Sequence, residues 1–267
     1  MAGLSTHTVT TGSPWPVPWL PWPPMVRPQC PAGKRCRPAT PGLGPIWRPY
    51  GHDGRAAVSV IAIDGPAGSG KTTVARALAD RLGLEYLDTG AMYRAVAFAV
   101  LRRGVDPDES EQVARVAASM ELTLDGGCCL VDGVDATVDI RGSEVTRVVS
   151  IVSAIPGVRT EMVCRQRAWV AARGGGVIEG RDIGSVVFPD ADAKVYLTAS
   201  TDVRARRRSD QDDAGDVEAV AADIRRRDEA DSDRRTSPLV RADGAVEIDT
   251  TTLGVDETVD RILRLLG

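Results

Sequence analysis

The chain has 267 residues, and its 33 Lys and Arg stand against 37 Asp and Glu, which leaves a formal net charge of only -4. So small a charge gives no reason to expect a nucleic-acid partner. No stretch approaches the roughly 18 uninterrupted apolar residues that a membrane helix needs, so we expect a soluble protein without a membrane partner. The five cysteines form no CxxC pair. They suggest neither a disulfide framework nor a zinc site, and they favour a reduced, cytoplasmic compartment.

The first 55 residues differ in composition from the rest, because they hold most of the 17 prolines and all but one of the five tryptophans. Proline at this density breaks helices and sheet ladders, so we predict a disordered extension over residues 1–55 with local polyproline II character. The prolines also interrupt the apolar run that a secretory signal needs. The extension could be dispensable, could reflect a start codon assigned too far upstream, or could be an arm that binds a partner. Cys30 and Cys36 would hold a metal only with ligands from elsewhere.

From residue 58 onward, apolar runs alternate with amphipathic stretches, a pattern typical of a parallel α/β sheet flanked by helices. We predict strands at 58–63, 85–87, 177–179, 194–197 and 246–249, and helices at 72–82, 92–102, 109–120 and 255–266. Helical spacing also covers 144–173, with a break near Pro156, and a highly charged helical pair is predicted over 201–235. Residues 58–267 are therefore expected to form one domain.

Residues 121–145 depart from this pattern. Strand-like segments at 122–124, 128–131 and 137–140 are separated by turn residues, which predicts small antiparallel hairpins inserted into the parallel domain. The adjacent Cys128 and Cys129 are interpreted as strand residues rather than as a redox pair.

Residues 65–72 read GPAGSGKT and fit the pattern GxxxxGK[ST], placed between a predicted strand and a predicted helix. Glycine supplies the unusual dihedrals and the close approach that let backbone N–H groups surround a phosphate. The helix that follows adds its positive dipole end to the same anion. Lys71 can bridge the β- and γ-phosphates, and the Thr72 hydroxyl can join the coordination shell of Mg²⁺, the expected metal. The segment therefore predicts a P-loop.

Two absences narrow the kind of nucleotide-binding protein. Guanine-selective GTPases use an Asn-Lys-x-Asp element, and this chain contains no asparagine. Large ATP-driven machines usually carry a long apolar strand that ends in acidic residues, and no such strand is evident in the sequence. A kinase for a small molecule remains, and ATP is expected on the loop and its flank: Gly65, Pro66, Ala67, Gly68, Ser69, Gly70, Lys71, Thr72 and Thr73.

Three later segments make a resemblance specific. The P-loop is followed by LDTGAMYR at 87–94, by EGRDIGSVVFPDA at 179–191 and by RDEADSDR at 227–234. Together these segments resemble bacterial cytidylate kinases, nucleoside monophosphate kinases of the P-loop class, over about residues 58–267. The resemblance implies transfer of the γ-phosphate of ATP to CMP, and to dCMP, by a monomer. It also implies that 121–145 is an acceptor-binding insert and that 201–235 is a lid over the phosphates, to which Arg204, Arg206, Arg207 and Arg208 contribute.

An acceptor monophosphate brings about two negative charges toward an ATP that is already anionic, so its site needs cations with fixed geometry. Arg suits this role because its planar fork binds phosphate oxygens in pairs. The candidates are Arg94, Arg181, Arg227 and Arg234. Arg227, Asp231 and Arg234 have the spacing of one helical face, which by itself is more typical of a solvated, salt-bridged surface.

The resemblance assigns roles to these residues. It implies that Arg227 and Asp231 hold the ribose side of the acceptor, that Arg234 reaches the acceptor phosphate, and that Ser150, Arg159 and Asp182 recognise cytosine and the neighbouring ribose. A carboxylate at Asp182 can accept from the exocyclic amine of cytosine, where uracil presents a carbonyl. Thr89 stands where the family commonly has Ser, and its hydroxyl could still meet the phosphate. Lys71, Arg181 and Arg234 are the expected catalytic cations. For Ser150 and Arg159, ordinary helix surface is the competing interpretation.

Two other functions stay open on the sequence alone. One is a kinase for a different small acceptor, such as UMP or shikimate. The other is a nucleotide-dependent switch, or a partner of nucleic acid, that uses the arginine-rich helices at 201–235 as a contact surface. The acidic residues interleaved with those arginines argue against nucleic-acid binding.

Overall fold

The computed structural model describes residues 59–212, 217–232 and 239–266 of the chain. The predicted disordered extension over residues 1–55 lies outside the described residues. Within the described part, no helix has the length and apolar character needed to cross a membrane.

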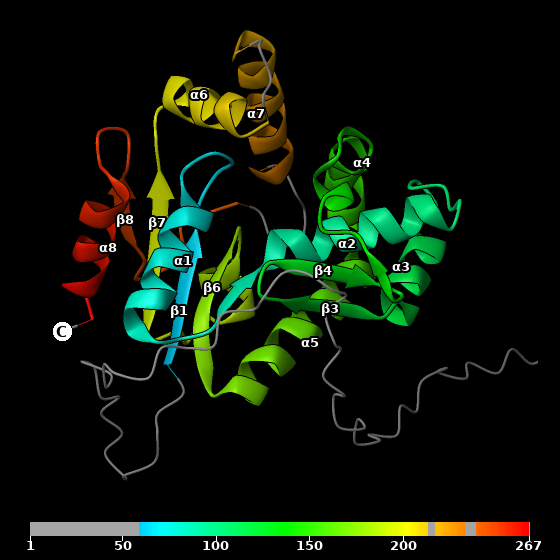
Figure 1. The fold of residues 1–267 in the computed structure, drawn as a ribbon, viewed down its shortest axis with the longest axis horizontal. Coiled ribbons are helices and arrows are strands. Elements are labelled where there is room, and N and C mark those ends of the chain that lie inside the picture. The colour runs from blue at the N-terminus through cyan, green and yellow to red at the C-terminus, as the bar shows by residue number, and fades with distance from the viewer. Residues whose placement is uncertain (1–58, 213–216, 233–238, 267) are drawn as a thin grey trace, which may run out of the picture. The chain divides into compact units, whose positions relative to one another are not determined.

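A five-stranded parallel sheet forms the centre of the fold (Figure 1). Its strands are β1 (Ser59–Asp64), β2 (Tyr86–Asp88), β6 (Gly175–Gly180), β7 (Ala193–Thr198) and β8 (Val246–Asp249), in the order β2-β6-β1-β7-β8. Asp64 at the end of β1 is in register with Gly180 of β6 and with Tyr196 of β7. The carboxyl ends of these strands therefore meet at one edge, where open α/β sheets bind ligands. All five predicted strands are confirmed, with small differences at their ends.

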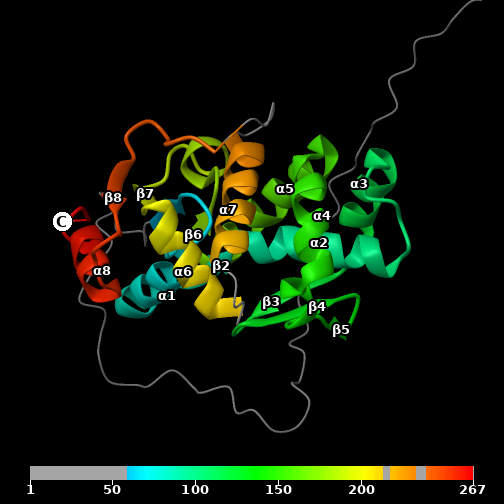
Figure 2. The ribbon, with the colours of Figure 1, turned by 90° about the horizontal axis from the view of Figure 1, so that it is seen from above.

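Different helices cover the two faces of the sheet, because successive side chains of β1 point in opposite directions. Ile61 and Ile63 pack with α1 (Lys71–Leu82) and α8 (Val255–Leu263), whereas Val60 and Ala62 belong to the larger core on the other face. That core includes α2 (Thr89–Arg102), α3 (Ser110–Ser119), α4 (Ser143–Ala154) and α5 (Pro156–Arg173). Figure 2 shows α1 and α8 on one side of the molecule and α3, α4 and α5 on the other.

Two helix boundaries have clear local causes. Helix α2 begins earlier than predicted because the Asp88 carboxylate accepts a hydrogen bond from the backbone N–H of Ala91 at 2.8 Å and caps the helix. The predicted break near Pro156 is confirmed, since α4 ends at Ala154 and α5 begins at Pro156. Proline suits the first position of a helix, where the backbone N–H has no intrahelical partner.

The insert between α3 and α4 is a three-stranded antiparallel sheet, β3 (Leu122–Asp125), β4 (Cys128–Val131) and β5 (Val134–Asp135). Antiparallel hairpins were predicted here, but the third strand at 137–140 is wrong. The strand stops because the Thr137 hydroxyl takes the place of a strand neighbour and accepts from the Cys129 N–H at 2.9 Å. The chain then turns into a short 3-10 helix, η1 (Asp139–Arg141). Cys129 is buried and Cys128 exposed in β4, as expected of strand residues.

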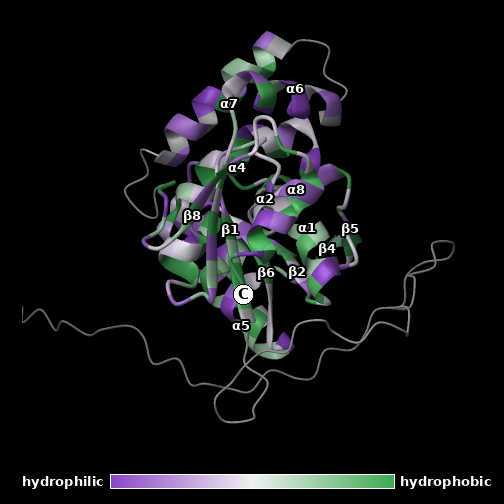
Figure 3. Ribbon diagram, turned by 90° about the vertical axis from the view of Figure 1, so that its left-hand side faces the viewer, coloured by the Kyte–Doolittle hydropathy of each residue, from purple (hydrophilic) through white to green (hydrophobic). Residues whose placement is uncertain are grey.

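Two highly charged helices, α6 (Thr201–Asp212) and α7 (Val217–Ser232), pack against each other beyond the carboxyl ends of the strands (Figure 1). We call this pair the lid. The helical pair predicted over 201–235 is confirmed for its described residues. Figure 3 shows hydrophobic colouring on the central strands and hydrophilic colouring over much of the lid. Ala205 and Ile224 are its buried apolar residues within the described part. Segments with so few apolar contacts open at a lower free energy than a sheet core.

The tightly packed face of α1 yields a stability prediction. Leu78 is fully buried, with 0% of its surface exposed, whereas Leu265 after α8 is 46% exposed. Leu78→Ala should lower the free energy of unfolding by about 2–5 kcal/mol, because it removes buried methyl groups and leaves a cavity. Leu265→Ala is the matched control and should change that free energy by about 0.5 kcal/mol or less. Urea unfolding of both variants measures the difference. Equal effects of the two substitutions would show that α1 does not pack as described.

Candidate active site

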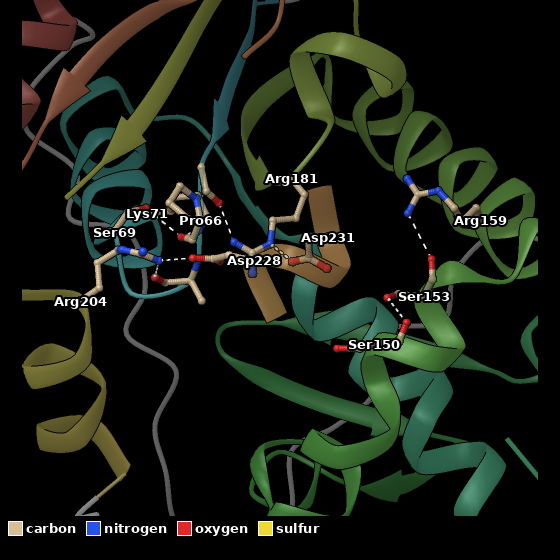
Figure 4. Close-up of polar contacts among 12 residues, drawn as sticks. Pro66, Ser69, Lys71, Ser150, Ser153, Arg159, Arg181, Arg204, Asp228 and Asp231 are labelled. Carbon is tan, nitrogen blue, oxygen red and sulfur yellow. Dashed lines mark hydrogen bonds and ion pairs between the residues drawn. The ribbon is translucent and has the colours of Figure 1, made fainter. Parts of the chain in front are cut away.

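The loop at residues 65–70 joins β1 to α1 and has a conformation that requires glycine. Gly65 has φ 148°, and a Cβ on it would lie 2.0 Å from the carbonyl oxygen of Leu197. Gly70 caps α1 in the left-handed region, with φ 89°. Ser69 and Lys71 brace the turn, since the Ser69 hydroxyl and the Lys71 ammonium donate to the Pro66 carbonyl at 3.0 and 2.7 Å (Figure 4). The loop therefore holds its shape through its own side chains.

The start of α1 carries a concentration of positive charge. Its first turn contains no acidic residue, so no side chain of the turn itself offsets the unpaired N–H groups and the positive end of the helix dipole. Burial and the nearby Arg181 guanidinium lower the pKa of Lys71 to about 8. An ammonium group that is buried beside another cation favours the binding of an anion.

Glu179 lies beside this turn, on the buried strand β6, and accepts from the Thr72 hydroxyl at 3.1 Å and from the Tyr86 hydroxyl. Burial, followed by the negative charge of Asp88, raises the pKa of Glu179 to about 7. Glu179 lies in the segment 179–191 but received no predicted role, because β6 lacks the long apolar run that precedes the acidic residue of large ATP-driven machines. The two apolar residues before it, Val177 and Ile178, were the feature of the sequence that could have indicated a role for Glu179.

The carboxylate of Asp64, at the end of β1, organises the segment after β6. It accepts from the backbone N–H groups of Ile183 and Gly184 at 2.8 and 2.7 Å, which fixes the turn η2 (Ile183–Val187). Arg181, just before this turn, donates to the Gly65 carbonyl at 2.7 Å and forms an ion pair with Asp231 of α7 at 2.9 Å. The P-loop, the segment after β6 and the lid are thus joined through one arginine (Figure 4).

A cavity of about 210 Å³ lies beside the P-loop, between the sheet edge, α2, α4 and α5. Every described residue that was predicted for the acceptor lines it. These residues are Thr89, Arg94, Ser150, Arg159, Arg181, Asp182 and Asp231. Two predicted residues are not placed: the side chain of Arg227 in α7 and the whole of Arg234 lie outside the described residues.

Arg159 is the most buried cation of this cavity, with 3% of its surface exposed, so it is not ordinary helix surface. It forms an ion pair with Asp182, donates to the Ser153 carbonyl at 3.3 Å and lies over the ring of Tyr93, 5.5 Å from its centre. Its Nε is buried and has no hydrogen-bond partner among the described residues. A buried donor of this kind is satisfied when a ligand brings an acceptor. Ser150, on the neighbouring helix, accepts from the Ser153 hydroxyl through its carbonyl (Figure 4).

Arg94 and Thr89 connect α2 to its surroundings. Arg94 donates to the Ile140 carbonyl at 3.1 Å and to the Thr146 hydroxyl at 2.9 Å, which ties α2 to the insert. The buried Thr89 hydroxyl donates to the Glu179 carbonyl at 2.6 Å.

A second cavity, of about 820 Å³, lies on the other side of the P-loop. Its walls come from the P-loop, the start of α1, the lid helix α6 and the segment between β8 and α8. Four residues line both cavities: Lys71, Thr72, Arg141 and Arg208. Arg141 is a residue that the sequence interpretation did not single out.

The predicted lid arginines have different environments. Arg204 forms an ion pair with Asp228 of α7 and donates to the Ala67 carbonyl at 3.1 Å, so it anchors the lid to the P-loop (Figure 4). Asp228 also accepts from the Ala67 N–H at 3.3 Å. Arg207 donates to the Thr250 carbonyl at 2.7 Å and lines the larger cavity. Arg206 is exposed, and Arg208 is at the boundary of the two cavities.

Comparison with known proteins gives consistent results. A family model described as cytidylate kinase matches residues 61–267. The cytidylate kinase of Mycolicibacterium paratuberculosis (strain ATCC BAA-968 / K-10) is 49% identical over 215 residues, which are 78% of this chain and 94% of the relative. The cytidylate kinase of Rhodococcus opacus (strain B4) is 48% identical over 216 residues, with the same two shares. That of Corynebacterium glutamicum (strain ATCC 13032) is 49% identical over 215 residues, again covering 78% and 94%.

The buried carboxyl of Asp64 yields a prediction about pH. Burial raises its pKa from the ordinary value of 3.8 to about 6. Between these values the folded state holds a proton that the unfolded state has lost. The contribution of Asp64 to the free energy of unfolding is therefore fully present below about pH 4 and is lost as the pH rises through about 6.

Asp64→Asn removes this titration. The free energy of unfolding of the unchanged protein, minus that of the variant, should fall by about 3 kcal/mol between about pH 4 and about pH 7. Urea unfolding at several pH values measures the difference, in which contributions from distant carboxylates cancel. A difference that stays constant or rises with pH contradicts the prediction.

Proposed function

Because the chain belongs to the cytidylate kinase family, we propose that it transfers the γ-phosphate of ATP to CMP, and also to dCMP, giving ADP and CDP or dCDP. One structural observation supports the proposal independently of family membership. Two cavities adjoin at the P-loop, and both are lined by Lys71 and Thr72. Such an arrangement suits a donor and an acceptor that meet at a single transferred group. The family match lends no support to the alternatives of a shikimate kinase or a nucleotide-dependent switch.

ATP belongs in the larger cavity, with its phosphates on the P-loop. The residues proposed to bind it are Gly65, Pro66, Ala67, Gly68, Ser69, Gly70, Lys71, Thr72 and Thr73. The support is the left-handed cap at Gly70, the first turn of α1 that contains no acidic residue, and the buried ammonium of Lys71, whose pKa is lowered. All three favour a polyanion at this point.

The oxygen groups at the start of α1 fit a Mg²⁺ ion that arrives with ATP. The Thr72 hydroxyl contacts a carboxylate oxygen of Glu179, and both are hard oxygen donors of the type that Mg²⁺ prefers. Among the described residues no group of three or more metal-binding side chains occurs. This agrees with an ion held by one or two protein oxygens together with substrate phosphates. Thr72, with Glu179 beside it, would hold the ion, which when bound neutralises charge on the phosphate oxygens.

CMP belongs in the smaller cavity. We assign its phosphate to Arg94 and Arg181. On the family resemblance alone, we also assign the phosphate to Arg234 and a ribose contact to Arg227. Asp231, held by Arg181, faces the ribose. Ser150, Arg159 and Asp182 face the base. The unpartnered Nε of Arg159 supports this assignment, since a pyrimidine carbonyl supplies the acceptor that it lacks.

The transfer needs no general base. An anionic oxygen of the CMP phosphate attacks the γ-phosphorus in line, a new P–O bond forms, and the bond to the β-phosphate oxygen breaks to release ADP. Lys71, Arg181 and Arg234 are the proposed catalytic cations, and they act by position and charge. The lid must close over the phosphates, because water would otherwise take the place of CMP as the acceptor. The proposal includes a monomer that works in the cytoplasm.

Lys71→Met tests the donor assignment. The substitution removes the ammonium group but retains an unbranched side chain, so turnover with ATP and CMP should fall at least about 100-fold while the fold persists. A coupled assay of ADP release with CMP, dCMP, UMP, AMP and shikimate measures both activity and acceptor choice. Thermal unfolding provides the control for folding. Unchanged turnover in the variant contradicts the role of Lys71. ADP release that follows shikimate rather than CMP contradicts the proposed acceptor.

Asp182→Asn tests base recognition. The carboxylate can accept from the amine of cytosine, whereas an amide can also donate to the carbonyl of uracil. The ratio of kcat/KM for CMP to that for UMP should fall about 10-fold or more. This ratio cancels any general loss from the disturbed pair with Arg159. Asp190→Asn, at an exposed position of the same segment outside both cavities, is the matched control. An unchanged ratio in Asp182→Asn removes Asp182 from base recognition.

A further inference from the structure

Arg141, at the end of η1 in the insert, lies at the boundary of the two cavities. It lines both of them, together with Lys71, Thr72 and Arg208. The three cations of this set come from different parts of the fold, since Lys71 begins α1, Arg208 belongs to the lid and Arg141 to the insert. All three therefore lie where the two cavities adjoin.

The backbone at Arg141 is held firmly. Ile140 is buried, with 2% of its surface exposed, and its carbonyl accepts from the Arg94 guanidinium at 3.1 Å. The N–H of Arg141 donates to the Val138 carbonyl at 3.0 Å, and the N–H of Ile140 donates to the Ala136 carbonyl at 2.9 Å. The side chain of Arg141, by contrast, is 50% exposed. A charged group thus extends from a fixed point.

The present partner of Arg141 is easily exchanged. Its Nη2 lies 3.3 Å from Oδ2 of Asp88, and the other oxygen of that carboxylate caps α2. Ion pairs open to solvent contribute little to stability. A phosphate offers more negative charge and several oxygens to a guanidinium fork, so it competes well against this single contact.

Other arginines near the P-loop already have bonds that hold the fold together. Arg181 joins the Gly65 carbonyl to Asp231, and Arg204 joins the Ala67 carbonyl to Asp228. Arg141 differs because its own side chain is 50% exposed, against 17% for Asp88, and because the pair has one contact within the described residues.

We propose that Arg141 is a further catalytic residue. When both substrates are bound, it leaves Asp88 and binds oxygens of the transferred phosphoryl group from the side of the insert. This rests on the proposed function, because it requires two phosphorylated substrates in adjoining cavities. Arg141 keeps all its protons during the transfer. The P–O bonds that form and break are those of CMP and ATP, and the guanidinium contributes charge and position.

Arg141→Gln and Arg141→Lys, in the full chain, test the proposal through kcat, both KM values and thermal unfolding. In Arg141→Gln, kcat should fall about 100-fold or more, while either KM changes by much less, because the contact belongs to the transferred group. Arg141→Lys should recover part of the loss, since it restores charge without the fork. The matched control is Arg147→Gln, because Arg147 is 71% exposed in α4 and lines neither cavity. Its kcat should equal that of the unchanged protein.

Asp88→Asn distinguishes a catalytic role of Arg141 from a structural role in which its ion pair with Asp88 only holds the insert to α2. Asparagine retains an oxygen that can cap α2, but it loses the charge that holds Arg141. We expect its loss of kcat to be much smaller than that of Arg141→Gln. Equal losses in the two variants, with no further loss in the double variant, overturn the proposal because the ion pair would then act only as a tether. Unchanged kcat in Arg141→Gln overturns it as well. If the unchanged protein releases no ADP in response to CMP, the proposed function fails first and this inference fails with it.

Discussion

The arrangement of the site depends on the carboxylate of Asp64. It ends the central strand β1 immediately before the P-loop, and it accepts the backbone N–H groups of Ile183 and Gly184 on the neighbouring segment. Two short stretches that lie more than a hundred residues apart are therefore fixed against each other by one buried group. Arg181 adds a second link, through the Gly65 carbonyl. The distance between the P-loop and the smaller cavity follows from these bonds, and the proposed in-line transfer would tolerate little variation in that distance.

The charges around the loop are mutually compensated in the structure. Arg181 lies with Asp231, Arg204 with Asp228 and Arg159 with Asp182, while Lys71 donates to the Pro66 carbonyl. Burying cations without partners would be costly, so carboxylates of the lid and of the segment after β6 pair with them. On the proposed function, polyanionic substrates would change this balance and recruit the cations whose present contacts are weakest. The lid, which has few buried apolar residues within its described part, is suited to such rearrangement.

Prediction from sequence succeeded where local pattern and motif agree. The P-loop lies between β1 and α1 as expected. The described residues that were predicted for the acceptor line one cavity although they come from several segments, and their role stays a prediction. It failed at 137–140, where the alternation of side chains suggested a strand. There the Thr137 side chain interrupts the ladder by binding the Cys129 N–H. Glu179 and Arg141 received no role, because each acquires its significance from neighbours distant in the chain.

The amino-acid sequence determined the parallel sheet, the helical pair of the lid and the phosphate-binding loop. These features follow from hydrophobic periodicity and from the backbone freedom of glycine, both of which act over a few residues. Only the tertiary structure decided which arginines hold the fold and which remain available to a ligand. Arg141 and Arg204 are the same residue type, yet the side chain of Arg141 is half exposed and that of Arg204 is buried against the P-loop. Burial and the geometry of distant partners set that difference, and neither is encoded in local pattern.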